Sequence, residues 1–331
     1  MAHQASSSGA DSRKRASSEV PSDSSCVPHS PKVLDGKTLA RAVARTLSGR
    51  VAKVRAAIGR APGLAVILVG ENAASKTYVA SKHKFAKECG LETFDSHLPA
   101  STTRDELRKV IESYNANDAV DGILLQLPLP APLDGSEFVR MIAPEKDADG
   151  LHPANQGLLL QGAPAPRPCT PLGVMTMLDL ALSDVTLSDT TTLADIPRAS
   201  LAGKSAVVIG RSQLVGKPMG FLLLERNATV TFAHSKTTDL PAVCRAADIV
   251  VAAVGVPNLV KADWVKTGAI VLDVGINRMP DGKLCGDVAY SEVAPRSSAI
   301  TPVPGGVGPM TVAMLISNTV ENCARRSGIT L

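Results

Sequence analysis

The sequence predicts an α/β protein of two domains, each built around a mostly parallel sheet. Helical patterns and short apolar runs alternate along the chain, which is typical of a sheet covered by helices. The alternation occurs in two blocks, and a stretch rich in Thr, Ser and Asp, residues 183–200, lies between them and is interpreted as a surface loop. With 331 residues, the chain is long enough for two domains with separate cores.

The first block begins with a helical pattern over residues 38–58, followed by the apolar strand LAVILVG over residues 64–70. A helix with Tyr78 and Lys82 comes next, and then a short strand near Thr93. TRDELRKVIESYNAN predicts a further helix, and DGILLQLPLP predicts a further buried strand. Buried strands that alternate with helices indicate a parallel sheet in this block.

Tyr78 and Lys82 are four residues apart, so both side chains lie on one face of their helix. Such a pair is also common on a solvated helix face. Gln126 interrupts the apolar run ILLQLPLP, and a buried amide without partners costs about 1–3 kcal/mol. The Gln126 amide either belongs to a functional site or holds neighbouring backbone through a hydrogen bond.

Two loops of the sequence combine polar or turn-forming residues with apolar surroundings. PEKDADG contains Asp147 and Asp149, which suit either a binding site or a capped turn. TPVPGGVGPMT, residues 301–311, is a rigid loop of Pro and Gly before a last apolar helix. Its glycines indicate close approach of the backbone to a ligand, although a simple chain reversal would use the same residues.

The second block contains a pattern typical of nucleotide binding. The strand AVVIG is followed by a loop with Gly210 and Gly216 and by a helix from about Pro218. A glycine turn before a helix binds pyrophosphate through free N–H groups and the helix dipole. The spacing is G-x5-G rather than G-x-G-x-x-G, so a tight connection without a ligand is the alternative.

The next strand favours NADP over NAD. An NAD site has an acidic residue about 20 residues after the glycine turn, where the carboxylate binds the ribose hydroxyls. Here the strand ATVTFA ends in His234, Ser235 and Lys236, and Arg211 lies in the glycine turn. Arginine, serine and lysine would bind a ribose phosphate, which a carboxylate would repel.

Composition excludes several classes of function. The formal net charge is only +4 and the basic residues are dispersed, which argues against nucleic acid as a partner. The six cysteines are scattered without a C-x-x-C pair, which argues against a zinc site or a disulfide framework. The apolar runs are too short to span a bilayer, and no signal-peptide pattern is found. We therefore expect a cytoplasmic protein without a metal.

The first 31 residues are expected to form a disordered tail. They are rich in Ser and have no apolar period, so they cannot bury enough surface to offset the entropy of ordering. A mitochondrial presequence is the alternative, because Arg13, Lys14 and Arg15 lie among serines. Asp11, Glu19 and Asp23 argue against it, since such presequences contain few acidic residues.

A series of motifs resembles one known family. YVASK, QLPLP, KDADG, PCTPLG, GRSQLVGKP, ATVTFAHSKT, LDVGIN, GDV and PVPGGVGPMTVAML occur in that order from about Val33 onward. The series resembles the bifunctional methylenetetrahydrofolate dehydrogenase/methenyltetrahydrofolate cyclohydrolase family, also called the FolD family. The chain departs from the family pattern by its N-terminal tail and by a longer loop over residues 184–198. It is too short for the synthetase domain that is fused to some relatives.

The resemblance implies a folate cleft between a catalytic domain, residues 32–178 completed by a helix over 309–331, and a Rossmann-type NADP-binding domain, residues 179–308. It implies that the catalytic residues are Lys82, Tyr78, Gln126 and Asp149, with no metal. It adds Leu125, Leu127, Pro304, Gly305, Gly306 and Thr311 as further folate-binding residues. It assigns NADP binding to Thr170, Gly210, Arg211, Ser212, Ser235, Gly255 and Ile276, and it implies a homodimer.

The implied chemistry suits these residue types. Transfer of a hydride from the methylene carbon to NADP⁺ requires alignment, whereas addition of water to the methenyl cation requires proton transfer. A lysine withdrawn from water, such as Lys82, can accept and return a proton. A relative with only the dehydrogenase activity is the nearest alternative, and a non-catalytic sensor of NADP or folate is a second. The joint presence of Tyr78, Lys82, Gln126 and Asp149 argues against both.

Overall fold

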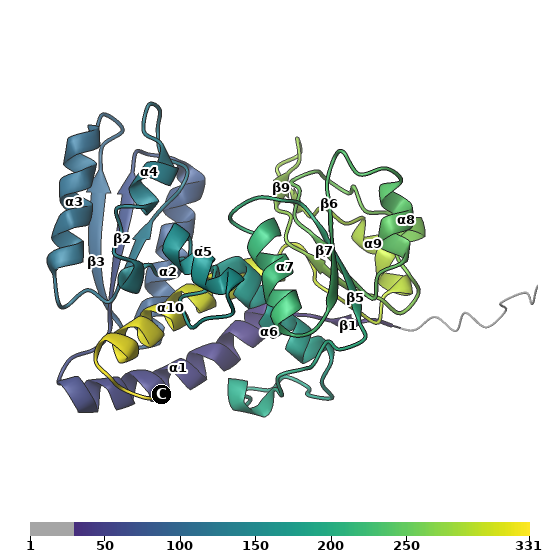
Figure 1. Cartoon of the computed structure of the whole chain (residues 1–331), viewed down its shortest axis with the longest axis horizontal. Coiled ribbons are helices and arrows are strands. Elements are labelled where there is room, and N and C mark those ends of the chain that lie inside the picture. Colours follow the sequence, from purple (N-terminus) through teal and green to yellow (C-terminus); the bar gives the residue numbers. More distant parts are fainter. Residues whose placement is uncertain (1–29) are drawn as a thin grey trace, which may run out of the picture.

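A computed structural model describes residues 30–331 as two lobes joined by long helices (Figure 1). The predicted disordered tail therefore lies almost wholly outside the described residues. Each lobe has its own parallel sheet, as the alternation of helices and strands predicts. No helix within residues 30–331 combines the length and the apolar character needed to cross a bilayer.

The first lobe contains a parallel sheet in the order β3 (Glu92–Leu98), β2 (Gly63–Val69), β4 (Gly122–Leu125). Every residue of the central strand β2 is buried. Alternate side chains of a strand point to opposite faces, so Ala65 and Ile67 pack on one side and Leu64 and Val66 on the other. A strand covered on both faces must be apolar throughout, which explains the run LAVILV.

Helices cover both faces of this first sheet. On one face lies α3 (Arg104–Ala116), which starts with a capping box between Thr103 and Glu106 and buries Leu107 and Ile111. The opposite face is covered by α1 (Gly36–Ile58), α2 (Ala73–Glu88) and α10 (Val307–Arg326). Short elements complete the lobe: α4 (Gly135–Val139), η1 (Pro144–Lys146) and α5 (Pro153–Leu160).

The second lobe contains a sheet in the order β1-β11-β8-β7-β5-β6, and every neighbouring pair is parallel. The strands are β1 (Lys32–Val33), β5 (Ser205–Ile209), β6 (Thr229–Ala233), β7 (Ile249–Ala252), β8 (Ile270–Asp273) and β11 (Ala299–Ile300). Its other elements are α7 (Gly216–Glu225), α8 (Leu240–Arg245), η3 (Ala262–Trp264), α9 (Tyr290–Val293), η4 (Ala294–Arg296) and the hairpin of β9 (Asn277–Arg278) and β10 (Leu284–Cys285).

The chain crosses between the lobes at both ends. Lys32 and Val33, which the predicted boundaries assign to the catalytic domain, pair with β11 at the edge of the second sheet. The chain then enters the first lobe through α1. At the other end, α10 returns to the first lobe, where the amide of Asn318 donates to the carbonyls of Ala148 at 2.9 Å and Arg167 at 2.8 Å.

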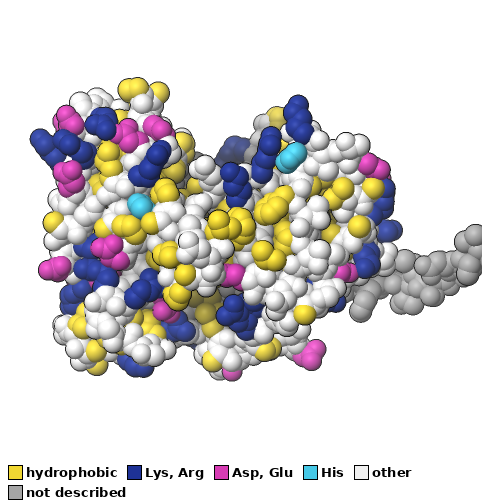
Figure 2. Space-filling model, in the orientation of Figure 1, with side chains coloured by type: hydrophobic (Ala, Val, Ile, Leu, Met, Phe, Trp, Pro, Cys, Tyr) yellow, Lys and Arg dark blue, Asp and Glu magenta, His cyan; other side chains and the backbone are white. Residues whose placement is uncertain are grey.

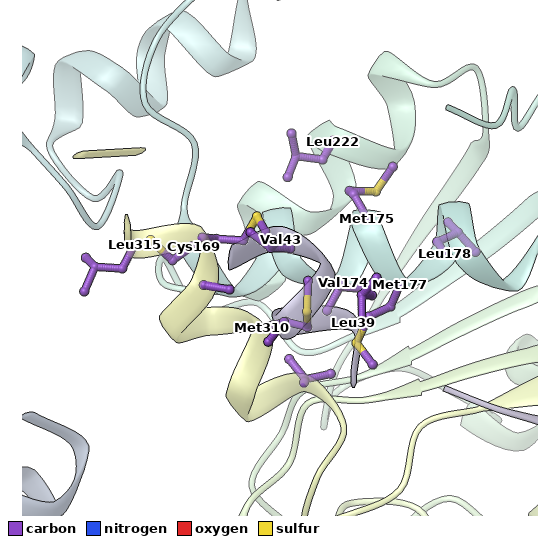
Figure 3. Close-up of a cluster of buried hydrophobic side chains, with 14 of the residues drawn as sticks. Leu39, Val43, Cys169, Val174, Met175, Met177, Leu178, Leu222, Met310 and Leu315 are labelled. Carbon is purple, nitrogen blue, oxygen red and sulfur yellow. The ribbon is translucent and has the colours of Figure 1, made fainter. Parts of the chain in front are cut away.

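One apolar cluster joins the two lobes. It is built where α1, α10 and α6 (Cys169–Ala181) pack together, and it continues to α7 of the second lobe. Figure 3 shows Leu39 and Val43 of α1 beside Val174 and Met310 of α6 and α10. The relative position of the lobes is thus fixed by packed side chains as well as by chain connectivity.

Residues 183–200 are more than a surface loop. They contain η2 (Leu193–Asp195), and Thr191 and Ile196 are buried. The guanidinium of Arg45 on α1 donates to the carbonyl of Thr191 at 2.7 Å and to that of Ser188 at 3.1 Å. The stretch runs over the surface, as the sequence predicts, and the apolar residues spaced within it pack against α1.

Candidate active site

Lys82, in the first lobe, is buried and its side chain lines a cavity. Its helix α2 is capped by Asn72, whose side chain accepts from the N–H of Ser75. Only 7% of Lys82 is exposed, and its Nζ donates to Oε1 of Gln126 at 2.9 Å. The amide nitrogen of Gln126 donates to the carbonyl of Leu127 at 2.7 Å, which turns the amide oxygen toward the lysine. A buried lysine nitrogen with one fixed acceptor keeps its remaining bonding positions free for a ligand.

The cavity beside Lys82 has a volume of about 420 Å³ and draws its walls from both lobes. Tyr78 lies one helical turn before Lys82 and is 39% exposed. The hydroxyls of Thr170 on α6 and Thr311 on α10 lie 3.0 Å apart. The lining residues are Asn72, Ser75, Tyr78, Lys82, Gln126, Leu127, Pro128, Asp149, Leu151, Cys169, Thr170, Leu214, Val215 and Thr311. We call this space the lysine cavity.

The two aspartates of the KDADG loop have different roles. Asp147 is 1% exposed and accepts from the N–H groups of Gly150 at 3.0 Å and His152 at 2.8 Å and from the Asn155 amide at 2.9 Å. Burial raises the pKa of Asp147. Asp149 is half-buried and lines the lysine cavity. Asp147 therefore holds the loop, and Asp149 is the carboxylate that a ligand can reach.

A second cavity of about 660 Å³ lies on the other side of Tyr78, which lines both. The loop of Pro304, Gly305 and Gly306 forms one wall, and Ile276 contributes to another. Gly306 fits because a Cβ there would lie 2.4 Å from the carbonyl oxygen of Pro302. We call this space the loop cavity.

Leu125 does not reach either cavity. It is 3% exposed and belongs to the apolar cluster of Ile67 and Phe138, beneath the sheet. Leu125 and Gln126 are neighbours in an extended segment, so their side chains point to opposite faces. Its predicted role as a folate-binding residue is therefore not supported by its position.

The glycine turn after β5 requires its glycines. Gly210 has φ of 131°, and a Cβ there would lie 2.3 Å from the carbonyl oxygen of Ala253. A Cβ on Gly216 would lie 2.4 Å from the carbonyl oxygen of Gly210. Ser212 Oγ accepts from the N–H groups of Val215 at 3.1 Å and Gly216 at 3.3 Å, so α7 begins at Gly216 rather than near Pro218.

The predicted phosphate-binding side chains lie at the same edge of the second sheet. β5 and β6 pair in parallel with Ile209 opposite Ala233, so Arg211 and Ser235 both follow strand ends at that edge. Both side chains are exposed. Figure 2 shows a notch between the two lobes with Lys and Arg side chains along its second-lobe edge. The arrangement suits a negatively charged ligand that crosses the sheet edge toward the lysine cavity.

Two buried carboxylates hold backbone at the strand ends of the second lobe. Asp287 is fully buried and accepts from the N–H groups of Val254, Gly255 and Val256 at 2.7–3.0 Å. Asp273 accepts from the N–H groups of Gly275, Asp287 and Val288, each at 2.9 Å. Burial raises the pKa of Asp273 to about 6.

Family models match both lobes. Residues 34–149 match "Tetrahydrofolate dehydrogenase/cyclohydrolase, catalytic domain", and residues 168–327 match the NAD(P)-binding domain of the same family. The Bifunctional protein FolD 3 of Rhizorhabdus wittichii is 50% identical over 305 residues, which are 91% of this chain and 95% of that protein. The chain belongs to the tetrahydrofolate dehydrogenase/cyclohydrolase family. The predicted family and the predicted α/β fold are thereby confirmed.

Solved structures of family members have the same fold. The bifunctional FolD enzyme of Campylobacter jejuni is 45% identical with a TM-score of 0.82, and the match covers 89% of this chain and 99% of that one. The Trypanosoma brucei dehydrogenase-cyclohydrolase, solved with NADP cofactor and an inhibitor, is 38% identical with a TM-score of 0.80. That match covers 89% of this chain and 98% of the other. Both lobes therefore keep the family arrangement.

Within this family fold, the lysine cavity brings together seven residues predicted from the sequence: Tyr78, Lys82, Gln126, Leu127, Asp149, Thr170 and Thr311. The loop cavity brings together Pro304, Gly305, Gly306 and Ile276. Gly210, Arg211, Ser212, Ser235 and Gly255 line neither cavity and belong to the open sheet edge.

The sequence reasoning missed five residues around these spaces. Asp273 and Asp287 hold backbone at the strand ends of the second lobe, and Lys37, Arg41 and Lys84 line the loop cavity. The signal for the aspartates was present in LDVGIN and GDV, where an acidic residue follows an apolar strand or a glycine. The basic residues gave no signal, because exposed Lys and Arg occur on most helices.

Proposed function

We propose that the protein oxidises 5,10-methylenetetrahydrofolate to the 5,10-methenyl form with NADP⁺ and hydrolyses that product to 10-formyltetrahydrofolate. The observation that carries the proposal is the bond of 2.9 Å between Lys82 and Gln126 at a cavity that Asp149 also lines. The names of the relatives from Rhizorhabdus wittichii and Campylobacter jejuni support the same pair of activities.

The residues of the nucleotide side fit a dinucleotide phosphate. Gly210 and Gly216 let the turn between β5 and α7 pack tightly at the sheet edge, where dinucleotide phosphates bind in folds of this kind. Arg211, Ser212 and Ser235 would hold the phosphates, and Thr170, Gly255 and Ile276 would adjoin the nicotinamide. When bound, NADP⁺ supplies the hydride acceptor. The absence of a carboxylate at the end of β6 favours NADP over NAD.

Lys82 is the residue best suited to move protons during hydrolysis. When water adds to the methenyl carbon it loses one proton. As the bond from that carbon to the ring nitrogen then breaks, the new hydroxyl loses the second proton to form the formyl group, the ring nitrogen gains one proton, and the other is released. The lysine amine can accept the first proton and return it to the nitrogen, while Gln126 fixes the position of Nζ. Tyr78 would pack on the folate, and the Asp149 carboxylate would accept hydrogen bonds from the pterin ring.

Asp149 is also positioned to stabilise the positive charge that forms on the folate. Removal of hydride creates a cation on the substrate, and a carboxylate in the same cavity stabilises that charge. The hydride step itself needs alignment rather than a base. The threonine pair of Thr170 and Thr311 lies where the folate and nicotinamide sides meet, and it would fix the relative position of the two ligands.

One assay tests the proposed function. Purified protein is given methylenetetrahydrofolate with NADP⁺ or with NAD⁺, and reduced cofactor and methenyl absorbance are followed together. We expect reduction of NADP⁺ in preference to NAD⁺. When methenyltetrahydrofolate is supplied separately and no cofactor is present, we expect the protein to hydrolyse it faster than buffer alone does. Dehydrogenation without hydrolysis would favour the dehydrogenase-only alternative. Failure of both would overturn the proposal.

Two further properties belong to the proposal. We expect a homodimer, as the resemblance implies, and light scattering of the purified protein tests this. We also expect a cytoplasmic location, and imaging of the full chain in cells of its source would reveal a mitochondrial location instead if the N-terminal segment were a presequence.

A further inference from the structure

The position of the Asp149 side chain in the lysine cavity depends on the backbone on either side of it. Ala148, which precedes it, is fully buried. Gly150, which follows it, has φ of 71°, and a Cβ there would lie 2.3 Å from the carbonyl carbon of Arg167. Residues 147–150, which we call the aspartate segment, are therefore packed directly against the chain that leads into α6.

The chain that leads into α6 forms another wall of the same cavity. Cys169 and Thr170 both line the lysine cavity. The N–H of Cys169 donates to the carbonyl of Asp149 at 3.2 Å, which joins residues 167–170, the threonine segment, to the aspartate segment. Two walls of the cavity thus depend on how these two segments are held against each other.

Asn318 of α10 holds the two segments together. It is 5% exposed, and its amide nitrogen donates to the carbonyl of Ala148 at 2.9 Å and to that of Arg167 at 2.8 Å. Both N–H bonds of the amide are therefore used, and its orientation is fixed. Within residues 30–331, no other side chain from outside the two segments forms hydrogen bonds to both of them.

The same face of α10 meets the threonine segment at a second point. Thr311 is seven residues before Asn318, which is about two helical turns, so both side chains lie on one face of α10. The hydroxyl of Thr311 lies 3.0 Å from that of Thr170. One helix face therefore contacts both ends of the threonine segment, and at Asn318 it also contacts the aspartate segment.

We propose that Asn318 is a positioning residue for folate binding, because it sets where the Asp149 carboxylate lies in the lysine cavity. This inference rests on the proposed function, in which Asp149 binds the pterin ring. Asn318 does not line the cavity, so it acts through Asp149 rather than by contact with the ligand. Without its amide, the buried carbonyls of Ala148 and Arg167 lose a donor, and the two segments shift until other donors reach them.

The test is a double-mutant cycle on the binding of tetrahydrofolate to the full-length protein, measured by calorimetric titration. A hydrogen bond to a carboxylate contributes about 10- to 100-fold in affinity, so Asn318→Ala, which displaces that carboxylate, should weaken binding by about 10-fold. In the Asp149→Ala background the same change should have an effect within about 2-fold, because the group through which Asn318 acts is gone. A purely structural role for Asn318 would weaken binding equally in both backgrounds.

Val320→Ala is the matched control. Val320 is fully buried, lines neither cavity and follows Asn318 by two residues, so it points to another side of α10. Its truncation should lower the melting temperature by a few degrees, as Asn318→Ala should, and leave the affinity for tetrahydrofolate unchanged. If Asn318→Ala does not fold, the cycle is run with Asn318→Ser, whose hydroxyl still donates one bond and which should weaken binding by about 3-fold.

Three results would overturn Asn318 as a positioning residue: wild-type affinity in the Asn318 variant, an equal loss with and without Asp149, or an equal loss in Val320→Ala. The last would show that reduced stability alone explains the effect. A wild-type protein that binds no tetrahydrofolate would overturn the proposed function together with this inference. Normal binding by the wild type therefore separates a failure of the inference from a failure of the proposed function.

Discussion

The lysine cavity and the glycine turn prepare for their ligands in different ways. At the lysine cavity the side chains are buried and already bonded: Lys82 is 7% exposed and fixed to Gln126. At the glycine turn the backbone is fixed by close packing of Gly210 and Gly216, whereas Arg211 and Ser235 are exposed. The first site holds side-chain groups in position, and the second holds a backbone turn in position. Substitutions at the first should therefore change rate, and those at the second should change affinity.

The largest effect is expected from Lys82→Met. Methionine fills a similar space but cannot carry a proton, so hydrolysis of methenyltetrahydrofolate should fall by about 10²–10⁴. Dehydrogenation should fall less, because it depends on alignment of the folate. Both rates are measured on one preparation, with folate affinity determined by titration. Lys87→Met on the exposed face of the same helix is the control. Unchanged hydrolysis with folate still bound would make Lys82 a positioning residue.

Asp273 should give the second lobe a dependence on pH. Its pKa of about 6 in the folded protein exceeds the value of about 3.9 in an unfolded chain. The folded state then binds the proton more tightly, so the contribution of Asp273 to the free energy of unfolding falls as pH rises from about 4 to about 6. The total change is about 3 kcal/mol.

Asp273→Asn removes that titration. The unfolding free energy of wild type minus that of this variant should therefore fall by up to about 3 kcal/mol between pH 4 and pH 7, as measured by urea unfolding. The exposed Asp263→Asn variant should show no such trend. A difference that stays constant with pH would show that the Asp273 carboxylate titrates alike in both states, because the backbone hydrogen bonds offset the effect of burial.

Arg211→Ala should act on NADP⁺ affinity and spare the chemistry. A charge-assisted bond to phosphate contributes about 1.5–3 kcal/mol, so KM for NADP⁺ should rise by about 10- to 100-fold, with little change for NAD⁺. Lys204→Ala, an exposed lysine just before β5, should change neither. If KM for both cofactors rose equally, Arg211 would contact the shared pyrophosphate rather than the ribose phosphate.

The smallest effect is expected from removal of residues 1–31. A chain that begins at Lys32 keeps β1 and the three bonds from Lys32 Nζ to the carbonyls of Leu180, Ser183 and Val185, so both activities should be unchanged. A chain that begins at Leu34 loses these contacts and should unfold at a lower temperature. If the chain that begins at Lys32 lost activity, the N-terminal segment would have a function that its composition does not indicate.

The sequence predicted more of the lysine cavity than of the loop cavity, for a physical reason. Lys82 and Tyr78 are neighbours on one helix, and Gln126 stands out as a polar residue in an apolar run. Such local contrasts are visible without a structure. Lys37, Arg41 and Lys84 come from two helices and look like ordinary exposed residues, so only the packing of α1 beside α2 and the 302–308 loop brings them to one cavity.

The sequence by itself determined the alternation of helices and buried strands. It also determined the family, through one set of motifs typical of nucleotide binding and another typical of folate binding. Those properties depend on local periodicity and on residues adjacent in the chain. The tertiary structure decided that Asp149 rather than Asp147 lines the lysine cavity, that Leu125 points away from that cavity, and that β1 belongs to the second sheet. Each of these depends on contacts between segments far apart in sequence, since side-chain direction and strand pairing are set by the packed partners rather than by local propensity.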